Sequence, residues 1–288
     1  MYKILLKVTA LIAVLVLIDV AVCLVYPDVS AYRKANPRKT AMMEYREREY
    51  EKAGKKIRLV QTWVPLSRIS PYMTKAVLIA EDDKFWHHDG FDYDGIEHAL
   101  EKDIRDGKFK AGGSTISQQL AKNLWLSPSR NPVRKIKEAV LTLRMERSLS
   151  KRRILEIYLN VAEWGDGIFG IEAAARHWFG VSAVGLSADQ SARLASVLPN
   201  PRKYSPVNPS RYVTNRSRII YGIMVRRGIV LPDFDEVMKP EPSGGAAGGP
   251  APPGGMSNYS GAAGSPPSPV ASTMGAFTSA GHGRLLGR

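Results

Sequence analysis

An almost unbroken apolar run near the N-terminus constrains this chain more than any other feature. From Ile4 to Tyr26 it reads ILLKVTALIAVLVLIDVAVCLVY, and roughly 20 apolar residues suffice to cross a bilayer as a helix. Within lipid such a run must be helical, because the hydrocarbon offers no partners for backbone N–H and C=O groups. We therefore expect residues 1–27 to hold a cytoplasmic start and a transmembrane anchor.

A cleavable signal peptide is the alternative explanation of this run. Its length and its poor small-residue cleavage pattern favour an uncleaved anchor. Asp19 is the anomaly, since an acid inside a span costs roughly 2.5–3.5 kcal/mol on insertion scales. It is expected to lie near the outer interface, to be protonated, or to pair with another helix. Basic residues flank the run on both sides, so charge bias does not fix its orientation.

The rest of the chain divides by composition. Residues 28–58 are polar and charged, and Glu44 to Lys52 fits a solvated helix held by charge pairs, so we expect a juxtamembrane stalk. Residues 59–239 form one domain of ordinary size, rich in helical patterns, with a strand-like run from Ile57 to Leu66. Residues 240–288 are rich in Gly, Pro, Ala and Ser with very few charges, which predicts a disordered tail.

The overall charge narrows the class of partner. The formal net charge is +14, from 41 Lys and Arg against 27 Asp and Glu. This excess suits a nucleic acid, a membrane surface or a phosphorylated substrate, although a generic basic surface would give the same balance. The lack of a recognisable nucleic-acid module argues against nucleic acid. A single cysteine, Cys23, excludes an intrachain disulfide.

Capping signals place helices along the domain. Ser70 followed by Pro71 predicts a helix start, and the apolar residues after it carry that helix to Glu81. Other expected boundaries, each marked by a cap or a glycine, are Thr115 with Gln118, Ser150, Gly180, Ser187 with Gln190, Ser210 and Gly228.

The stretch EDDKFWHHDG, from Glu81 to Gly90, mixes acids, histidines and aromatics directly after an apolar helix. Carboxylate proton chemistry needs charges and apolar walls close together. At the C-terminal end of its helix, Glu81 faces the negative end of the dipole, which would raise its pKa and suit a general acid or base. An exposed Glu at a helix end is the plain alternative. A metal site built from His87, His88, Asp89, Asp92 and Asp94 matches no closed ligand spacing.

A glycine loop and the helix after it form a second candidate region. Gly112 to Ser114 precede a helix N-terminus, which can hold an anion. Within that helix Gln119, Lys122 and Asn123 fall on one face, and leucines fall on the other. The polar face predicts binding of a polar or phosphorylated ligand, with a solvated surface as the alternative.

The next helix carries a glutamate whose position is ambiguous. Ile136, Val140 and Leu143 form its expected buried stripe. Glu138 is displaced from that stripe and follows Arg134 by four residues, so an ordinary helix salt bridge would explain the pair.

Four sequence blocks are long and specific. They are EDDKFWHHDGFDYDGI from Glu81, GGSTISQQLAKNLWLS from Gly112, RKIKEAVLTLRMERSLSKRRILEIYLN from Arg134, and WGDGIFGIEAAARHWFG from Trp164. In content and order these blocks resemble the peptidoglycan glycosyltransferases, glycosyltransferase family 51, and the resemblance covers roughly Val60 to Arg227. The sequence after it is not that of a penicillin-binding transpeptidase domain, so the resemblance is to the monofunctional type.

This resemblance implies a mainly α, lysozyme-like bilobal glycosyltransferase domain with an N-terminal transmembrane helix. Its smaller jaw lobe would dip into the membrane, with Phe109, Trp125 and Leu126 touching lipid. The implied reaction polymerises lipid II into β-1,4-linked glycan, with inversion at the donor anomeric carbon and release of undecaprenyl diphosphate. The implied location is the inner (cytoplasmic) membrane, single-pass, with the catalytic domain in the periplasm.

The resemblance also assigns roles and partners. Glu81 matches the general base, and Glu138 matches the second family glutamate, beside the donor diphosphate. The cations that hold this diphosphate match Lys122, Arg134 and Lys135. The residues that bind the substrate or shape its site match Ser114, Thr115, Gln119, Asn123, Asp82, Phe85 and His88. No cofactor is required and no metal ligands are implied, with a divalent cation (Mg or Mn) near the diphosphate as an optional addition. Partners are lipid II, the growing strand, the membrane and other cell-wall synthases or division proteins, but no nucleic acid.

Two other classes of protein share some of these features. A peptidoglycan-cleaving lytic enzyme would have a lysozyme-like fold and a catalytic Glu, but would need neither the basic cluster nor Glu138. A non-enzymatic anchored scaffold would need none of these groups. Polymer formation from lipid II separates the three hypotheses.

Overall fold

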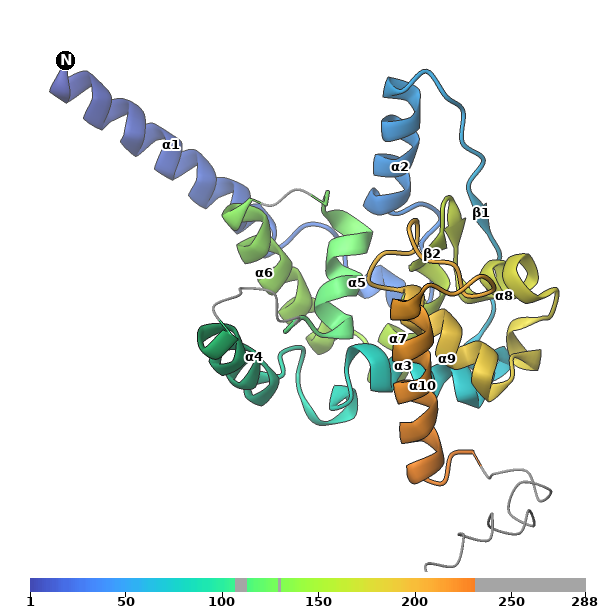
Figure 1. The fold of residues 1–288 in the computed structure, drawn as a ribbon. Coiled ribbons are helices and arrows are strands. Elements are labelled where there is room, and N and C mark those ends of the chain that lie inside the picture. The colour runs from blue at the N-terminus through green and yellow to red at the C-terminus, as the bar shows by residue number, and fades with distance from the viewer. Residues whose placement is uncertain (107–112, 129–130, 231–288) are drawn as a thin grey trace, which may run out of the picture. The chain divides into compact units, whose positions relative to one another are not determined.

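The computed structural model describes residues 1–106, 113–128 and 131–230 and is mainly helical, which confirms the predicted class (Figure 1). The predicted tail and Phe109 lie outside the described residues. The α-helices are α1 Tyr2–Val22, α2 Ala41–Lys52, α3 Pro71–Glu81, α4 Tyr93–Asp106, α5 Ile116–Trp125, α6 Pro132–Ser148, α7 Lys151–Val161, α8 Ile171–Phe179, α9 Ala188–Val197 and α10 Arg211–Arg226. The strands are β1 Val60–Gln61, β2 Glu163–Gly165 and β3 Ile168–Phe169.

Two groups of helices share one apolar core. Helix α3 packs against α9 and α10, and α5 packs against α6 and α7. Met73 on α3, Leu120 on α5 and Leu155 on α7 belong to the same buried cluster, which removes apolar surface from water. This arrangement brings the C-terminal end of α3 to the N-terminal end of α5, where the two candidate sequence regions meet.

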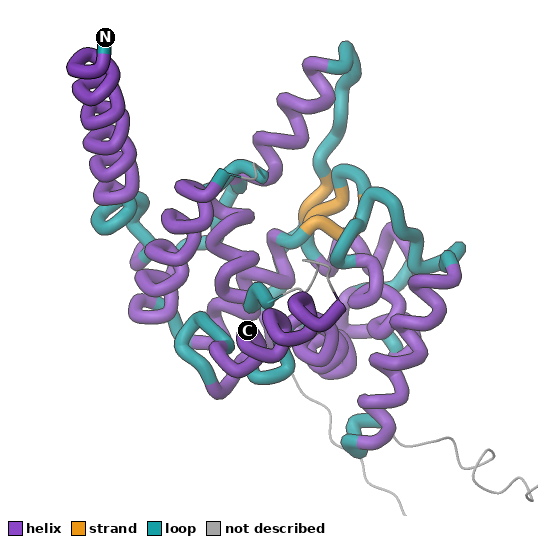
Figure 2. The backbone as a smooth tube through the Cα atoms, turned by 60° about the vertical axis from the view of Figure 1, so that its left-hand side comes forward, coloured by secondary structure: helices purple, strands orange, loops and turns teal. Residues whose placement is uncertain are grey.

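A small sheet borders the helices (Figure 2). Strand β3 lies between its two neighbours, pairing parallel with β1 through Val60 and Ile168 and antiparallel with β2 through Phe169 and Glu163. The strand expected within Ile57 to Leu66 is therefore present, although it covers two residues.

The capping signals located most helix ends correctly. Thr115 and Ser187 form the predicted capping boxes, and Ser150 and Ser210 accept hydrogen bonds as N-caps. Ser70 precedes Pro71 as predicted, but its hydroxyl donates to the Leu186 carbonyl instead of capping α3. Its side chain therefore ties the start of α3 to the segment before α9.

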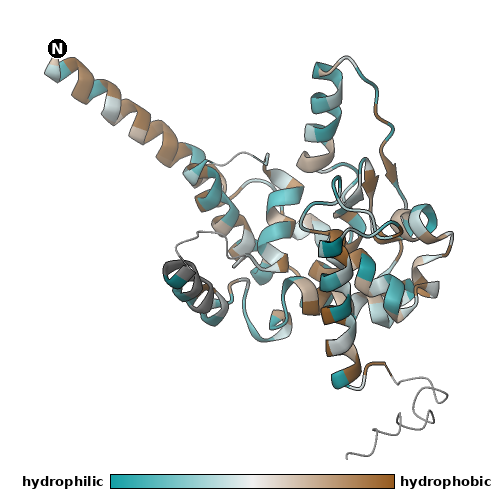
Figure 3. Cartoon of the chain, in the orientation of Figure 1, coloured by the Kyte–Doolittle hydropathy of each residue, from teal (hydrophilic) through white to brown (hydrophobic). Residues whose placement is uncertain are grey.

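The apolar run forms α1, a single helix that is long and apolar enough to cross a membrane (Figure 3). Its side chains are exposed along almost its whole length, as expected of a surface that lipid would cover. The helix therefore supports the predicted anchor by both length and composition.

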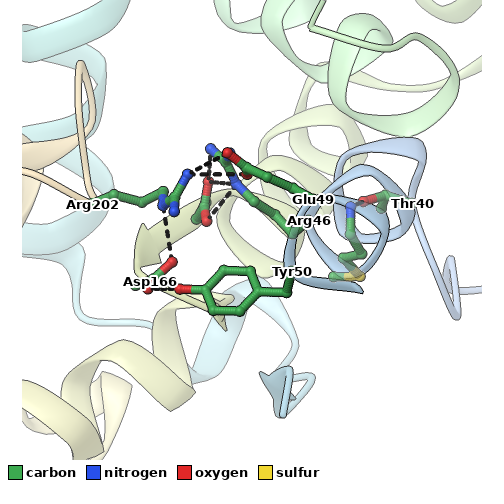
Figure 4. Close-up of polar contacts among 8 residues, drawn as sticks. Thr40, Arg46, Glu49, Tyr50, Asp166 and Arg202 are labelled. Atoms are coloured by element: carbon green, nitrogen blue, oxygen red, sulfur yellow. Dashed lines mark hydrogen bonds and ion pairs between the residues drawn. The ribbon is translucent and has the colours of Figure 1, made fainter. Parts of the chain in front are cut away.

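Helix α2 was expected to be solvated, and this expectation is wrong for its inner face. It packs against α5, and Arg46 donates to both carboxylate oxygens of Glu163 on β2, at 3.0 Å from Nε and 2.8 Å from Nη2. Figure 4 shows Arg202 reaching Glu49 and Asp166 beside this pair. Long-range charge pairs therefore fasten the helix to the domain, whereas its sequence suggested only pairs within the helix.

Of the residues expected to touch lipid, Leu126 is packed within the protein and Trp125 is partly covered by it. Leu126 is buried in the core, and Trp125 stacks on Tyr32 with ring centroids 5.9 Å apart. The segment between α1 and α2 supplies Tyr32, a long-range contact that the sequence did not reveal. The lipid-facing prediction is therefore wrong for Leu126, and Trp125 is partly covered.

Candidate active site

Glu81 is the last residue of α3, whose buried apolar residues hold that helix against the core. Its side chain is 12% exposed. One carboxylate oxygen accepts a hydrogen bond from Gln119 Nε2 at 2.9 Å, and the other accepts from Arg216 Nη2 at 3.2 Å. Both donors come from other helices, α5 and α10, so the carboxylate is fixed by tertiary structure.

Burial raises the pKa of the Glu81 carboxyl above its ordinary value. The hydrogen bond from Gln119 and the positive charges of Arg216 and Lys122 oppose part of that rise. The predicted rise in the pKa of Glu81 is confirmed. Its largest cause is desolvation by burial, whereas the sequence pointed to the helix dipole. A carboxylate of this kind accepts a proton more readily than an exposed one.

Tyr158 fixes the orientation of the Gln119 amide. Its hydroxyl donates to Gln119 Oε1 at 3.0 Å, which leaves the Nε2 group to donate to Glu81. Burial holds the pKa of this tyrosine well above its usual value, with the nearby charges of Glu81 and Asp82 adding to the effect. Tyr158 therefore remains a neutral donor and supports the ionised form of Glu81.

Asp82, Phe85 and His88 follow Glu81 in the chain, and Asp82 lines the same cavity as Glu81. Asp82 Oδ1 lies 2.9 Å from His88 Nε2, and Oδ2 accepts from the backbone N–H of Ile116 at 2.9 Å, which joins the end of α3 to the start of α5. Phe85 is fully buried, with Lys151 Nζ 4.5 Å from its ring centroid. The geometry gives these three residues a shaping role, with no surface of Phe85 open to a ligand.

The glycine loop meets this scaffold at Thr115. Its hydroxyl donates to the carbonyl of Gly90 at 2.7 Å while also capping α5. Gly90 has φ +95°, a conformation that favours glycine, and a Cβ there would lie 2.8 Å from Thr142. The turn at Gly90, within the first block, is thereby held against both α5 and α6.

Glu138 on α6 is buried, with 3% of its surface exposed, but its environment is charged. Arg134 Nη1 donates to Oε2 at 2.6 Å and Lys135 Nζ donates to Oε1 at 2.5 Å. The helix salt bridge considered from the sequence is therefore present, and a second cation adds to it. Both oxygens of this carboxylate are engaged by cations of its own helix.

The expected buried stripe of α6 is wrong. Ile136 and Leu143 are exposed, and the buried face instead carries Glu138, Leu141, Thr142 and Met145. Helix α6 packs against α5, and Leu141 and Met145 of the buried face belong to the same apolar cluster as Leu120 of α5. The apolar pattern gave the wrong face because two polar residues lie on the buried side. Glu138 is paired there with cations, and the Thr142 hydroxyl donates to the Glu138 carbonyl.

Lys122 and Ser114 are each related to both halves of the candidate site, Lys122 through charge and Ser114 through contacts. Burial lowers the pKa of Lys122, the charges of Arg134 and Lys135 lower it further, and the charges of Glu138 and Glu81 raise it. Lys135 Nζ lies 3.4 Å from Ser114 Oγ, and Ser114 lines a cavity of about 220 Å³ together with Glu81 and Thr115. Through Ser114, the cavity beside Glu81 therefore reaches one of the predicted cations, Lys135.

The polar face predicted for α5 is confirmed. Gln119, Lys122 and Asn123 are each partly exposed, whereas the leucines of the opposite face are buried. The sequence reasoning missed Arg216 and Tyr158, which reach Glu81 directly and through Gln119. The only signal for Arg216 was the basic character of the helix after Ser210.

The described residues contain no group of three or more His, Cys, Asp and Glu side chains arranged to hold a metal ion. His88 is paired with Asp82, and Glu138 gives both oxygens to cations. A divalent ion at Glu138 would have to displace Arg134 or Lys135, so these residues do not form a ready cation site.

Known proteins resemble this chain over the region that carries the site. Residues 49–225 match the family model described as Transglycosylase. The chain is 45% identical to the biosynthetic peptidoglycan transglycosylase of Nitrosospira multiformis over 205 residues, covering 71% of this chain and 89% of that protein. It is 52% identical to the proteins of the same name from an Azoarcus species and from Aromatoleum aromaticum, over 67% and 65% of this chain and 84% and 83% of theirs.

Proposed function

The chain belongs to the transglycosylase family, and from that premise we propose that it polymerises lipid II into β-1,4-linked glycan strands and releases undecaprenyl diphosphate. A peptidoglycan transglycosylase is a glycosyltransferase of cell-wall synthesis. The observation that carries the finer proposal is Glu81, a largely buried carboxylate of raised pKa that contacts Arg216 and lies near the charge of Lys122.

Glu81 acts as the general base in this proposal. The 4-hydroxyl oxygen of the acceptor sugar forms a bond to C1 of the donor, on the face opposite the diphosphate. The bond from C1 to the diphosphate oxygen breaks, its electron pair leaves with the diphosphate, and C1 is inverted. Glu81 takes the hydroxyl proton, and its raised pKa makes that transfer easier.

Lys122, Arg134 and Lys135 bind the diphosphate. Negative charge grows on this leaving group, and fixed cations in a poorly hydrated site stabilise it most strongly. Glu138 orients two of these cations, because its oxygens accept from Arg134 and Lys135. We assign Ser114, Thr115, Gln119 and Asn123 to polar atoms of the substrate, with Asp82, Phe85 and His88 shaping the site around Glu81.

No cofactor is required in this scheme, since protein cations balance the charge of the leaving group. Mg or Mn would bind through the diphosphate oxygens, because Glu138 is already paired. We propose an inner-membrane location with residues 59–239 in the periplasm, which the anchor-like helix α1 supports. Lipid II, the growing strand and the membrane are the partners, and other cell-wall synthases or division proteins would act with them.

Purified full-length chain mixed with labelled lipid II tests this function. We expect a polymer that lysozyme digests, together with one undecaprenyl diphosphate released for each new linkage. Cleavage of finished sacculi without polymer formation would instead indicate a lytic enzyme. A folded chain inert in both assays would contradict enzymatic function altogether.

A further inference from the structure

Helix α6 has two faces with different contacts. Arg134, Lys135 and Glu138 form the face described above. Lys137 and Arg144 are seven residues apart and therefore lie on one side of the helix, two turns from each other. That second side faces α1 and the residues that follow it.

The second face is bonded to the end of the apolar helix. Lys137 Nζ forms an ion pair with Asp19 Oδ1 at 2.7 Å. Arg144 donates from Nη1 to the Cys23 carbonyl at 2.8 Å and from Nη2 to the Val25 carbonyl at 2.9 Å. Carbonyls at a helix C-terminus lack partners within the helix and attract cations, so Arg144 satisfies groups that the end of α1 leaves open.

A mixed polar and apolar cavity of about 560 Å³ borders this contact. Asp19, Cys23 and Lys137 line it, together with Trp125 and Leu141. Cys23, the single cysteine of the chain, is only 6% exposed. Its thiol therefore reports whether the end of α1 is covered.

The position of Asp19 within α1 supports an interfacial contact. A helix of 21 residues is about 32 Å long, close to the thickness of a bilayer's hydrocarbon core. Asp19 lies in the last turn, so an α1 that spans the bilayer would place it near the end of the hydrocarbon. Of the three sequence-based explanations for this acid, the Lys137 contact favours pairing with another helix near the interface.

We infer that Asp19 and Lys137 form a docking pair that sets the height and rotation of α6 relative to the membrane. Consecutive side chains leave a helix about 100° apart, so fixing Lys137 also fixes the direction of Glu138. Lys137 is thus a positioning residue that aims the diphosphate-binding face at a lipid-anchored substrate. This inference rests on the proposed function, because it assumes such a substrate.

The test uses the full-length chain in nanodiscs of phosphatidylethanolamine and phosphatidylglycerol. Asp19→Asn and Lys137→Gln each break the pair, and Asp19→Lys combined with Lys137→Asp restores it with reversed charges. Arg147→Gln removes a charge from an exposed position of the same helix and serves as the matched control. Two quantities are measured: the rate at which a water-soluble maleimide labels Cys23, and the rate of polymerisation of labelled lipid II.

We expect both single variants to be labelled faster and to polymerise roughly threefold to tenfold more slowly, since small displacements of catalytic groups reduce rates strongly. The reversed pair should recover both rates, and Arg147→Gln should match the wild type. Recovery by charge reversal distinguishes a specific pair from general damage to the fold.

Each contrary result has a definite meaning. Unchanged labelling in both single variants, or no recovery in the reversed pair, would overturn the docking pair. Faster labelling with unchanged polymerisation would overturn the positioning role. A wild-type chain that makes no polymer would refute the proposed function, while the labelling rates would still decide whether the pair exists.

Discussion

Glu138 is buried and Glu81 is largely buried, with 12% of its side chain exposed, but the protein surrounds the two carboxylates differently. Glu81 is held by the neutral amide of Gln119 and one guanidinium, Arg216, which arrive from separate helices. Glu138 is held by two cations, Arg134 and Lys135, from its own helix. Glu81 thus has one neutral and one cationic partner, whereas both partners of Glu138 are cations.

This difference separates two kinds of chemistry. Burial with limited compensation raises the pKa of Glu81, which suits a group that must take up a proton. A carboxylate with a cation on each oxygen is suited to holding those cations in place. We therefore expect changes at Glu81 to alter proton transfer and changes at Glu138 to alter charge stabilisation.

The largest effect is expected from Glu81→Gln, which keeps the shape and removes the base. Polymerisation should fall by about 10³-fold or more, within the range attributed to general bases. Initial rates with labelled lipid II measure the change, and Glu51→Gln on the exposed side of α2 is the control. A variant with substantial residual rate would mean that another group accepts the proton.

Glu138→Gln should have the next largest effect, because Arg134 and Lys135 lose their common partner. We expect a loss of about 10²-fold, typical of weakened electrostatic stabilisation. The charge of Glu138 also raises the pKa of Lys122, so its removal lowers that pKa and moves the basic limb of the pH–rate profile to lower pH. A shift of the acidic limb instead would assign the proton-accepting role to Glu138.

Arg216→Gln tests how the one cation that contacts Glu81 affects its pKa. The charge of Arg216 lowers the pKa of Glu81, so its removal raises that pKa and moves the acidic limb to higher pH. At pH values on that limb we expect a loss of roughly tenfold, since removing one nearby opposite charge shifts a pKa by about one unit and less of the base is then ionised. The pH dependence of the polymerisation rate measures this shift.

Arg218→Gln, an exposed position on the same helix, is the control for Arg216→Gln. It removes one charge without touching Glu81, so its acidic limb should coincide with that of the wild type. An equal shift in both variants would show that net charge, and not the contact with Glu81, sets the pKa.

The parts of the fold that the sequence predicts are those set by residues close together in the chain. The capping boxes at Thr115 and Ser187 involve residues three apart, so they can be read from the chain and are confirmed. The contact between Arg216 and Glu81 joins residues 135 positions apart, and no local pattern encodes it. The polar row of α5 was predictable, whereas the donors that complete the site around Glu81 were not.

The failures on α2 and α6 have a common physical origin. Apolar periodicity assumes that charged residues face water. Arg46 and Glu138 instead lie in protected contacts because opposite charges meet them there. The domain boundary expected at residue 59 remains a prediction, and the family match begins earlier, at residue 49.

The smallest effect, and the most direct contrast between the two glutamates, concerns stability. Glu81→Gln removes a charge whose burial is costly. After a flip of the Gln119 side-chain amide, its oxygen would accept from the NH₂ group of the glutamine introduced at position 81. The NH₂ group of Gln119 would then donate to the hydroxyl oxygen of Tyr158. We therefore expect Glu81→Gln to stabilise the fold at neutral pH by about 1 kcal/mol. Glu138→Gln should destabilise it by about 1–2 kcal/mol, a value reduced because Lys135 is half-exposed.

The pH dependence of this difference follows from the sign of the Glu81 shift. The folded-state pKa of Glu81 is raised, so the wild type loses stability relative to Glu81→Gln as the pH rises from the ordinary value of 4.5 through the folded-state value. Below the ordinary value the two proteins should have equal stability. Urea unfolding of the membrane-reconstituted chain at both ends of this range measures the difference. Equal stability at neutral pH would mean that the surrounding dipoles already compensate the buried charge, and the contrast between the two carboxylates would then rest on proton transfer alone.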